Sequence, residues 1–166
     1  MKRLIAEEIE ETLFTTSRPD AKIHTPVIAI SDKYAVSHYN GPHSVLEEGT
    51  EVTLYNVVDP TIEYKSTVQT ISQACDIVVF ELLDSHFASF PCYYGGMCSG
   101  GAYNQLGVDS FRNPTWNVGT ISEFRFNCFI GTSSKKPEDS TRVGIFSEYG
   151  RLLGFSTSKN MPIAQR

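Results

Sequence analysis

The chain lacks the features that would direct it to a membrane, a nucleic acid or a secretory route. No stretch of its 166 residues approaches the run of about 18 apolar residues that a membrane-spanning helix needs. Lys and Arg number 14 against 19 Asp and Glu, so the net charge of −5 provides no basic surface for phosphates. Residues 1–11 turn acidic after a few apolar positions, unlike a secretory leader. We therefore expect an intracellular globular protein with neither a membrane nor a nucleic-acid partner.

Cysteine is also scarce, and its spacing matches no zinc signature. The four cysteines are Cys75, Cys92, Cys98 and Cys128, and five residues separate Cys92 from Cys98. That gap is longer than the spacing of paired zinc ligands. Without a secretory leader we expect free thiols in a reducing compartment, and neither a metal nor a cofactor. A metal site built from Cys92, Cys98 and Cys128 is the alternative.

The N-terminal segment, residues 1–20, has the pattern of one amphipathic helix. Glutamates occupy its polar faces, and the apolar residues spaced for a single helical face are Leu4, Ile5, Ile9 and Leu13. The pattern predicts about three helical turns that end before Arg18-Pro19. We expect this helix to pack on the outside of the domain.

Beyond the helix, the sequence consists of short segments rich in β-branched and aromatic residues, each bounded by Asp, Gly, Pro or Asn. The predicted strands are 27–30, 34–37, 51–55, 67–71, 77–82, 118–122, 124–129, 143–146 and 151–155. The last two flank a predicted hairpin turn at 147–150, with Gly150 where a positive φ is needed. Many short strands without intervening helices indicate an all-β fold of antiparallel β-barrels.

A glycine-dense segment, residues 91–101, interrupts the regular spacing of strands. Glycines at this density favour a loop over a strand. We therefore expect this segment to lead from one barrel to the next. The predicted domains are an N-terminal barrel over 21–90 and a C-terminal barrel over 91–166.

Three side chains with catalytic chemistry lie far apart in the sequence, each beside a predicted strand. His38 follows the strand 34–37, and Asp76 opens the most apolar strand, 77–82. Ser140 precedes the final hairpin. A base, a carboxylate and a hydroxyl are the groups of a nucleophilic triad.

In these stretches the chain resembles the chymotrypsin-fold, or trypsin-like, serine peptidases. The resemblance runs over roughly residues 25–158 as an order of motifs, without an unbroken match. The stretches that carry it are 30–38 (ISDKYAVSH), 76–82 (DIVVFEL), 138–140 (EDS) and 150–155 (GRLLGF). The resemblance implies two antiparallel β-barrels packed against each other, with the site in the cleft between them, and a peptide or protein substrate.

By this resemblance, each of the three residues takes a catalytic role. His38 is the general base that accepts the proton of the serine hydroxyl, and Asp76 holds the imidazole in the correct tautomer. Ser140 attacks the scissile carbonyl, and the backbone amides at Glu138 and Ser140 form the oxyanion hole. His43, in the loop after the same strand, is the alternative base.

The nucleophile motif departs from the family pattern. Where these peptidases carry Gly-x-Ser-Gly-Gly, this chain reads Glu138-Asp139-Ser140-Thr141-Arg142. A side chain in a strained backbone conformation costs on the order of 1–3 kcal/mol, and the loss of one oxyanion donor costs roughly 10²–10³ in rate. Two functions therefore stay open: a serine endopeptidase with impaired catalysis, and a non-catalytic relative that binds peptides. A third function that stays open is that of a β-barrel interaction module unrelated to peptidases.

Two other serines compete with Ser140 for the role of nucleophile. Ser99 precedes two glycines as in the family motif, but 99 − 76 = 23 residues after Asp76 are too few for the strands that must come first. After Ser134, lysines stand where the family motif has glycines. Ser134 also lies 150 − 134 = 16 positions before Gly150, which is too long for the hairpin. We therefore predict Ser140 as the nucleophile.

Overall fold

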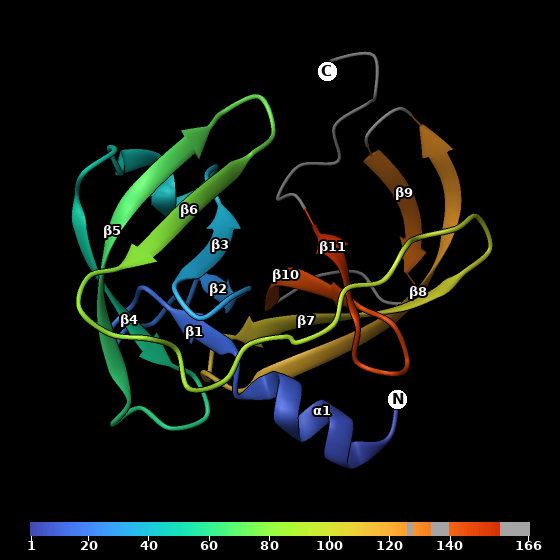
Figure 1. Ribbon diagram of the computed structural model, residues 1–166, viewed down its shortest axis with the longest axis horizontal. Helices are drawn as coiled ribbons and strands as arrows, with labels where there is room; N and C mark the ends of the chain where they lie inside the picture. Colours follow the sequence, from blue (N-terminus) through green and yellow to red (C-terminus); the bar gives the residue numbers. More distant parts are fainter. Residues whose placement is uncertain (126–127, 134–139, 157–166) are drawn as a thin grey trace.

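The computed structural model describes residues 1–125, 128–133 and 140–156, which are mostly β-structure (Figure 1). One short helix, α1 (Arg3–Glu10), lies outside two β units that sit side by side. The N-terminal unit is a closed six-stranded barrel, and the second unit is a five-stranded antiparallel sheet. This architecture confirms the predicted all-β fold of two packed units with a short N-terminal helix.

Six strands close the N-terminal barrel in the order β1-β2-β3-β6-β5-β4. They are β1 (Leu13–Thr15), β2 (Pro26–Ala29), β3 (Tyr34–His38), β4 (Glu51–Asn56), β5 (Glu63–Ser72) and β6 (Ile77–Leu82), with a 3-10 helix, η1 (Pro42–Val45), after β3. All pairings are antiparallel, and the pairing of β1 with β4 closes the ring. Strands β3 and β6, which carry the predicted base and acid near their ends, are therefore neighbours.

The burial of alternate side chains follows from the position of each strand. In β6, Val78, Phe80 and Leu82 are buried in the barrel interior, and the residues between them are half-buried. In β2 all the residues are buried. Val27 belongs to the barrel interior, whereas Ile28 belongs to a second core cluster that includes residues of the other sheet. Strand β2 is therefore covered on both faces, which places it between the two units.

The second sheet repeats most of the strand order of the barrel. Its strands are β7 (Ala102–Asp109), β8 (Pro114–Arg125), β9 (Cys128–Ser133), β10 (Ser140–Phe146) and β11 (Leu152–Phe155). The order β11-β10-β7-β8-β9 matches the barrel if β7 corresponds to β1 and β11 to β5. In the described part of the chain, no strand takes the place that β6 has between β3 and β5. The second unit is therefore a half-barrel over these residues.

One hydrophobic core joins the two units. Ile28 of the barrel packs with Leu106, Val143 and Phe146 of the second sheet, and all four are at most 1% exposed. Gly144 permits this approach, because a Cβ there would lie 2.7 Å from Cδ1 of Ile28. Buried apolar surface is the main stabilising term in folding, so this shared core holds the barrel and the sheet against each other.

The N-terminal helix is shorter than predicted. It ends at Glu10, and Leu13, which the helical spacing placed on it, lies in β1 opposite Ile28. Pairing with β2 on one side and β4 on the other outweighs the helical periodicity at this position. Ile9 joins the shared core, and Nε1 of Trp116 donates a hydrogen bond to Oε1 of Glu10 at 2.8 Å. These contacts attach α1 to the second sheet.

Two further strands differ from the prediction. Strand β7 is absent from the predicted set because its polar Asn104 and Gln105 have low β propensity. It nevertheless lies in the middle of the sheet, where β8 and β10 pair with it on both sides. The single predicted strand 124–129 is wrong, because Arg125 ends β8 and pairs antiparallel with Cys128, the first residue of β9.

The predicted hairpin turn at 147–150 is confirmed. Gly150 has φ +81°, and its N–H donates to the carbonyl of Ser147 at 3.0 Å. The N–H of Ser147 in turn donates to the carbonyl of Arg151 at 2.9 Å. A residue with a Cβ would be strained at this φ, so glycine is what lets β10 return directly into β11.

The cysteines in the described part do not cluster with other metal ligands. Cys75, Cys92 and Cys98 are free and exposed, and the side chain of Cys128 lies outside the described side chains. Among the residues whose placement is described, no three His, Cys, Asp or Glu side chains are arranged to hold a metal ion. Over the same residues, no helix has the length and apolarity to cross a membrane.

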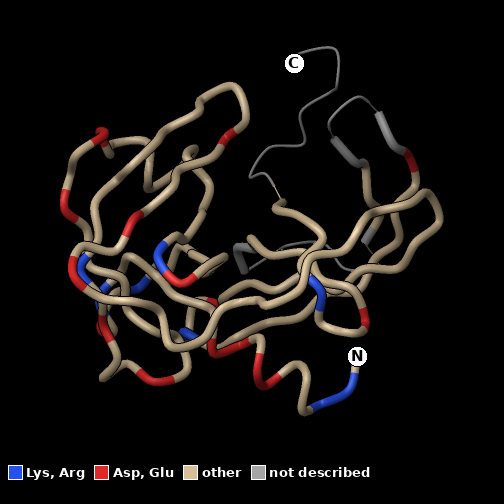
Figure 2. The backbone as a smooth tube through the Cα atoms, viewed as in Figure 1, with Lys and Arg blue, Asp and Glu red and all other residues tan. Residues whose placement is uncertain are grey.

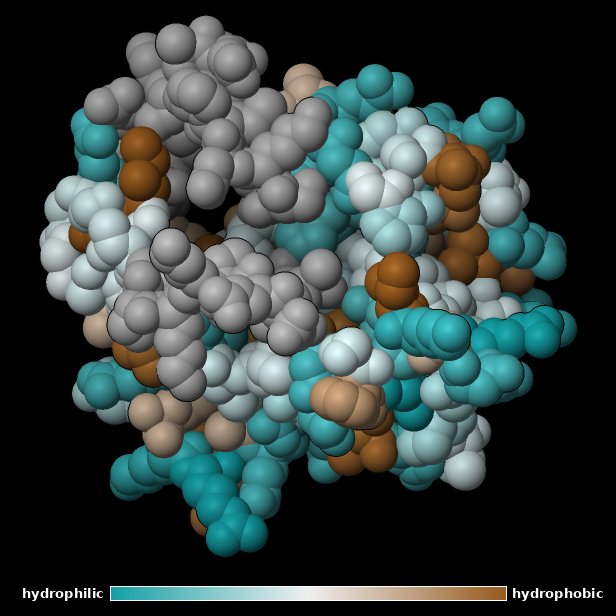
Figure 3. Space-filling model, turned by 180° about the vertical axis from the view of Figure 1, so that it is seen from behind, coloured by the Kyte–Doolittle hydropathy of each residue, from teal (hydrophilic) through white to brown (hydrophobic). Residues whose placement is uncertain are grey.

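Charged and apolar residues are unevenly distributed over the surface. Acidic positions follow α1 and the loops of the barrel, and few charges fall on the strands of the second sheet (Figure 2). Seen from behind, apolar side chains form separate small patches among polar ones (Figure 3). Among the residues that the structure describes, the most exposed apolar ones are Leu4, Val45, Phe111 and Tyr149. Isolated apolar residues of this kind are ordinary on protein surfaces.

Candidate functional site

His38 and Asp76 come together at the adjacent ends of β3 and β6. His38 is the last residue of β3 and pairs with Ile77, the first residue of β6. Asp76 directly precedes Ile77, so antiparallel pairing alone brings the two predicted residues to one end of the barrel. His38 is 4% exposed and Asp76 is 2% exposed. An imidazole and a carboxylate thus share one buried region.

Asp76 is held in an unusual conformation by the loop that follows His38. Its φ is +57°, a left-handed value that is uncommon for a residue with a side chain. The backbone N–H of Asn40 donates to Oδ1 of Asp76 at 2.7 Å, and Nδ2 of Asn40 donates to the same oxygen at 2.6 Å. The N–H of Tyr39 donates to the Asp76 carbonyl at 3.3 Å. Such over-determined strain is typical of functional sites.

His43, the alternative base, has both ring nitrogens engaged inside the protein. Nδ1 lies 2.9 Å from the carbonyl oxygen of His38, and Nε2 lies 2.7 Å from the hydroxyl of Thr16. The ring stands edge-on to Phe80, with 5.8 Å between centroids. Burial lowers the pKa of His43 and so favours the neutral ring. A 3% exposed imidazole with these partners is poorly placed to accept a proton from a substrate-facing serine.

Ser140 stands at the start of β10. Its backbone pairs with Asp109, the last residue of β7, and this end of β7 faces the barrel (Figure 1). The side chain of Ser140 lies outside the described side chains, and Glu138 and Ser134 lie outside the described residues. The predicted nucleophile and oxyanion hole therefore stay predictions.

His24 links this end of the second sheet to the barrel. It is 5% exposed and precedes β2 by two positions. Burial lowers its pKa most strongly, the positive charge of Arg112 lowers it further, and the carboxylate of Asp109 partly opposes them. The ends of β7 and β2 are thus within electrostatic reach of each other, on the side of the sheet where β10 begins.

Ser99 lies at the opposite end of the second sheet. It is exposed and occupies the turn that leads into β7, where the N–H of Gly100 donates to the carbonyl of Ile121 at 2.6 Å. Strand β7 has eight residues, so it spans about 25 Å between this turn and Asp109. The structure therefore does not bring Ser99 together with His38.

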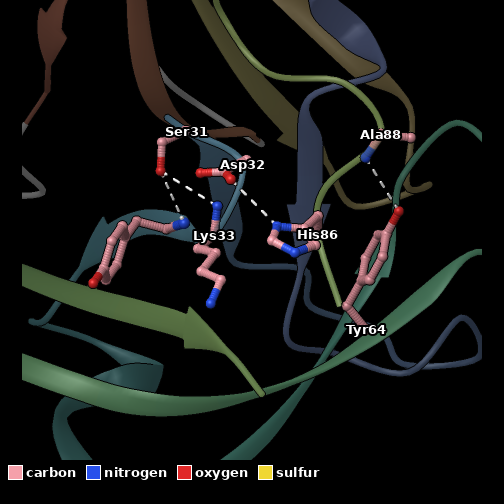
Figure 4. A network of polar contacts seen from close by, with 7 residues as sticks. Ser31, Asp32, Lys33, Tyr64, His86 and Ala88 are labelled. Atoms are coloured by element: carbon pink, nitrogen blue, oxygen red, sulfur yellow. Dashed lines mark hydrogen bonds and ion pairs between the residues drawn. The ribbon is translucent and has the colours of Figure 1, made fainter. Parts of the chain in front are cut away.

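The fourth histidine, His86, lies on the surface of the barrel (Figure 4). Its Nδ1 lies 3.3 Å from Oδ2 of Asp32, and both side chains are more than half exposed. Two positions further on, the N–H of Ala88 donates to the hydroxyl of Tyr64 at 3.4 Å. These contacts fasten the segment after β6 to the outside of the barrel, and His86 takes no part in the buried cluster around His38.

The residues that support the candidate base and acid could not be predicted from the sequence. Asn40 precedes Gly41 in a turn after the strand, a local signal of a loop that says nothing of a contact with Asp76. Thr16 has no such signal at all. Its contact with His43 joins residues 27 positions apart and depends on the closure of the barrel.

Comparisons with known proteins identify the fold. No protein-family model matches the chain, and no curated protein matches it in sequence. Solved structures do match. The MamO protease domain from Magnetospirillum magneticum has a TM-score of 0.68 at 10% identity and covers 95% of this chain and 89% of that one. The serine endoprotease from Yersinia pestis has a TM-score of 0.69 at 12% identity, and 92% of this chain matches 56% of it.

A third structure, the Rv3671c protease of M. tuberculosis in an inactive form, has a TM-score of 0.65 at 15% identity. The match covers 91% of this chain and 79% of that one. At these identities the likeness concerns the fold alone. Together with the closed barrel and the half-barrel, it confirms the resemblance at that level: the chain has the two-barrel fold of the chymotrypsin-like serine peptidases.

Proposed function

We propose that this protein is a serine-type endopeptidase that acts on a peptide or protein substrate. The observation that carries the proposal is the juxtaposition of His38 and Asp76 at the adjoining ends of β3 and β6, buried in a barrel of this fold. The position of Ser140 at the start of β10, on the side of the second sheet that faces the barrel, is consistent with a site between the two units.

In this mechanism the three residues perform one acyl transfer. His38 accepts the proton of the Ser140 hydroxyl while the serine oxygen bonds to the scissile carbonyl carbon. The C–N bond then breaks, and His38 returns the proton to the departing amine. Water repeats the sequence on the acyl-enzyme and frees the serine. Asp76 orients the imidazole and stabilises its charged form throughout.

The burial, the backbone conformation and the hydrogen bonds of Asp76 support this role. The protein holds a carboxylate at 2% exposure and in a left-handed conformation, with three hydrogen bonds from the loop after His38 to its carbonyl and carboxylate. A purely structural turn at this position is satisfied by glycine at lower cost. A carboxylate that must be fixed beside an imidazole is a reason to keep aspartate there.

A second candidate is a non-catalytic protein that binds extended peptides. It is favoured by one observation, the sequence Glu138-Asp139-Ser140-Thr141-Arg142, which lacks the glycines of an oxyanion hole. A carboxylate beside a developing oxyanion repels it, whereas peptide binding at a strand edge needs no oxyanion hole.

Labelling with a fluorophosphonate probe, followed by intact mass, tests the proposal. We expect one adduct on the wild type, none on Ser140→Ala or His38→Ala, and a wild-type adduct on the matched control Ser99→Ala. Unchanged labelling of Ser140→Ala would contradict the assigned nucleophile. An unlabelled wild type that is folded by circular dichroism and that still binds peptides would establish the second candidate instead.

A further inference from the structure

We infer that His43 is a positioning residue for His38: its buried imidazole donates a hydrogen bond to the backbone carbonyl of His38, opposite Pro26, which has no N–H to donate. The inference rests on the proposed role of His38 as general base. His43 touches no reacting atom and acts only through the main chain of His38.

The need for this contact follows from the register of β2 and β3. Ile28 pairs with Val36, so two positions further along the ladder Pro26 faces His38. Proline has no N–H, and it therefore cannot donate to the carbonyl of His38 as an ordinary residue does in a hydrogen-bonded antiparallel pair. A buried carbonyl without a donor costs free energy, so some other group must take this place.

The imidazole of His43 supplies the missing donor. Its Nδ1 lies 2.9 Å from the His38 carbonyl oxygen. A carbonyl can only accept a hydrogen bond, so Nδ1 carries the proton. Nε2 is then the acceptor, and the hydroxyl of Thr16, at 2.7 Å, donates to it. The three residues form a directed chain from Thr16 through His43 to His38.

Packing fixes the ring in this orientation. His43 is 3% exposed, and its edge meets the ring of Phe80 with 5.8 Å between centroids. η1, which carries His43, is joined to the end of β3 by the short turn at Gly41, where φ is +96°. The short loop therefore lets His43 form a hydrogen bond with His38, the last residue of β3, only five positions before it.

The hydrogen bond from His43 affects the orientation of the His38 side chain, because the Cα of His38, which carries the imidazole, lies in the same peptide plane as the His38 carbonyl. A carbonyl that rotates to find water carries the imidazole with it. A displacement of about 1 Å at a catalytic group lowers the rate by as much as roughly 10²-fold. The loss of the His43 donor is thus expected to act on His38 even though no atom of His43 faces a substrate.

Three substitutions at one position separate positioning from packing. His43→Asn keeps an amide N–H at the place of Nδ1, whereas His43→Gln carries its amide further out, toward Thr16. His43→Phe keeps the ring and its edge contact and has no polar atom. We expect fluorophosphonate labelling of His43→Asn to proceed within about threefold of wild type, and that of His43→Phe and His43→Gln to be slower by about tenfold or more.

Imidazole ¹H–¹⁵N spectra give a readout that does not depend on catalysis. We expect the ring signals of His38 to move in His43→Phe and to stay near wild type in His43→Asn, with the signals of surface His86 unchanged in both. Folding of each variant is checked by circular dichroism below its melting temperature.

The outcomes separate the inference from the proposed function. If the wild type is not labelled but the spectra change as expected, the proposed peptidase activity is contradicted and the positioning role of His43 is supported. Equal labelling of His43→Asn and His43→Phe, or His38 signals that do not move in His43→Phe, overturns the inference while the peptidase stands.

Discussion

Asn40 donates two hydrogen bonds to a single oxygen of Asp76, one from its backbone at 2.7 Å and one from its side chain at 2.6 Å. The donor lies two positions after His38, and the acceptor directly precedes the strand that pairs with His38. One short loop therefore fixes the carboxylate relative to the imidazole. It does so with the main chain as well as with the side chain, so a substitution at position 40 removes only part of the contact.

Asn40→Ala should lower the free energy of unfolding by about 1–3 kcal/mol, because it deletes a hydrogen bond to the buried carboxyl group of Asp76. Urea denaturation measures the loss. Ser44→Ala is the matched control. Its hydroxyl donates to the carbonyl of Gly41 at 2.6 Å in the same loop but is exposed, so its loss should stay within about 0.5 kcal/mol. Equal losses in the two variants would show that the Asp76 contact is not specially stabilising.

Acidification should destabilise the fold between pH 7 and pH 5. Burial holds the pKa of His43 and of His24 below the ordinary 6.5, so the unfolded chain takes up protons at a higher pH than the native one. The neutral rings contribute their full stability at a pH above the pKa that histidine has in the unfolded chain. That stability is lost as the pH falls toward the lower pKa of the folded state. The slope approaches about 1.4 kcal/mol per pH unit for each histidine whose unfolded form is protonated.

Urea denaturation at pH 7, 6 and 5 measures this slope. His43→Asn should flatten it, because an amide does not titrate. His86→Asn, at an exposed position, should keep the slope of the wild type. A slope in His43→Asn as steep as that of the wild type would contradict the assignment to His43.

Alanine at Gly119 or Gly131 should destabilise the second sheet, because the ring of Tyr103 crosses both glycines. A Cβ at Gly131 would lie 2.7 Å from Cε1 of Tyr103, and one at Gly119 would meet that ring and also the backbone carbonyl of Thr132. Overpacking of this kind costs about 1–3 kcal/mol. We expect Gly119→Ala to be the worse variant, since a carbonyl in a ladder cannot move aside.

The matched control for these variants is Gly96→Ala, where a Cβ would meet nothing within 4 Å. Its unfolding free energy should change by less than about 0.5 kcal/mol. Combining Gly131→Ala with Tyr103→Leu should recover part of the loss. If the double variant is no more stable than Gly131→Ala, the ring of Tyr103 is not the cause.

Arg112 joins the turn between β7 and β8 to the barrel, and it offers a test of the interface. Its Nη2 donates to the carbonyl of Asn56 at 2.5 Å, and its φ is +65°. Arg112→Ala loses the hydrogen bond and keeps the strained backbone, whereas Arg112→Gly loses the bond and relaxes it. Both should unfold at lower urea than the wild type, with the glycine variant about 0.5–1 kcal/mol more stable than the alanine variant. The reverse order would mean that the left-handed conformation is not populated at this position.

Strands whose side chains alternate between apolar and polar were among those predicted from the local pattern. The segment 77–82 shows the period of two that a half-buried strand requires, and β6 occupies those residues. Strand β7 shows no such pattern around Asn104 and Gln105, and it exists because β8 and β10 pair with it on both sides. The prediction for Leu13 was wrong in the opposite way. Its spacing fits a helix, but it pairs with Ile28 in the barrel.

Most of the short strands, the hairpin at Gly150 and the order of an imidazole, a carboxylate and a hydroxyl could be predicted from the sequence. These depend on residue type and on spacing over a few positions. The hydrogen bonds from Asn40 to Asp76, and from Thr16 through His43 to the carbonyl opposite Pro26, follow only from the folded barrel. Such contacts depend on strand register, and register is set by burial across the whole barrel and not by neighbours in sequence.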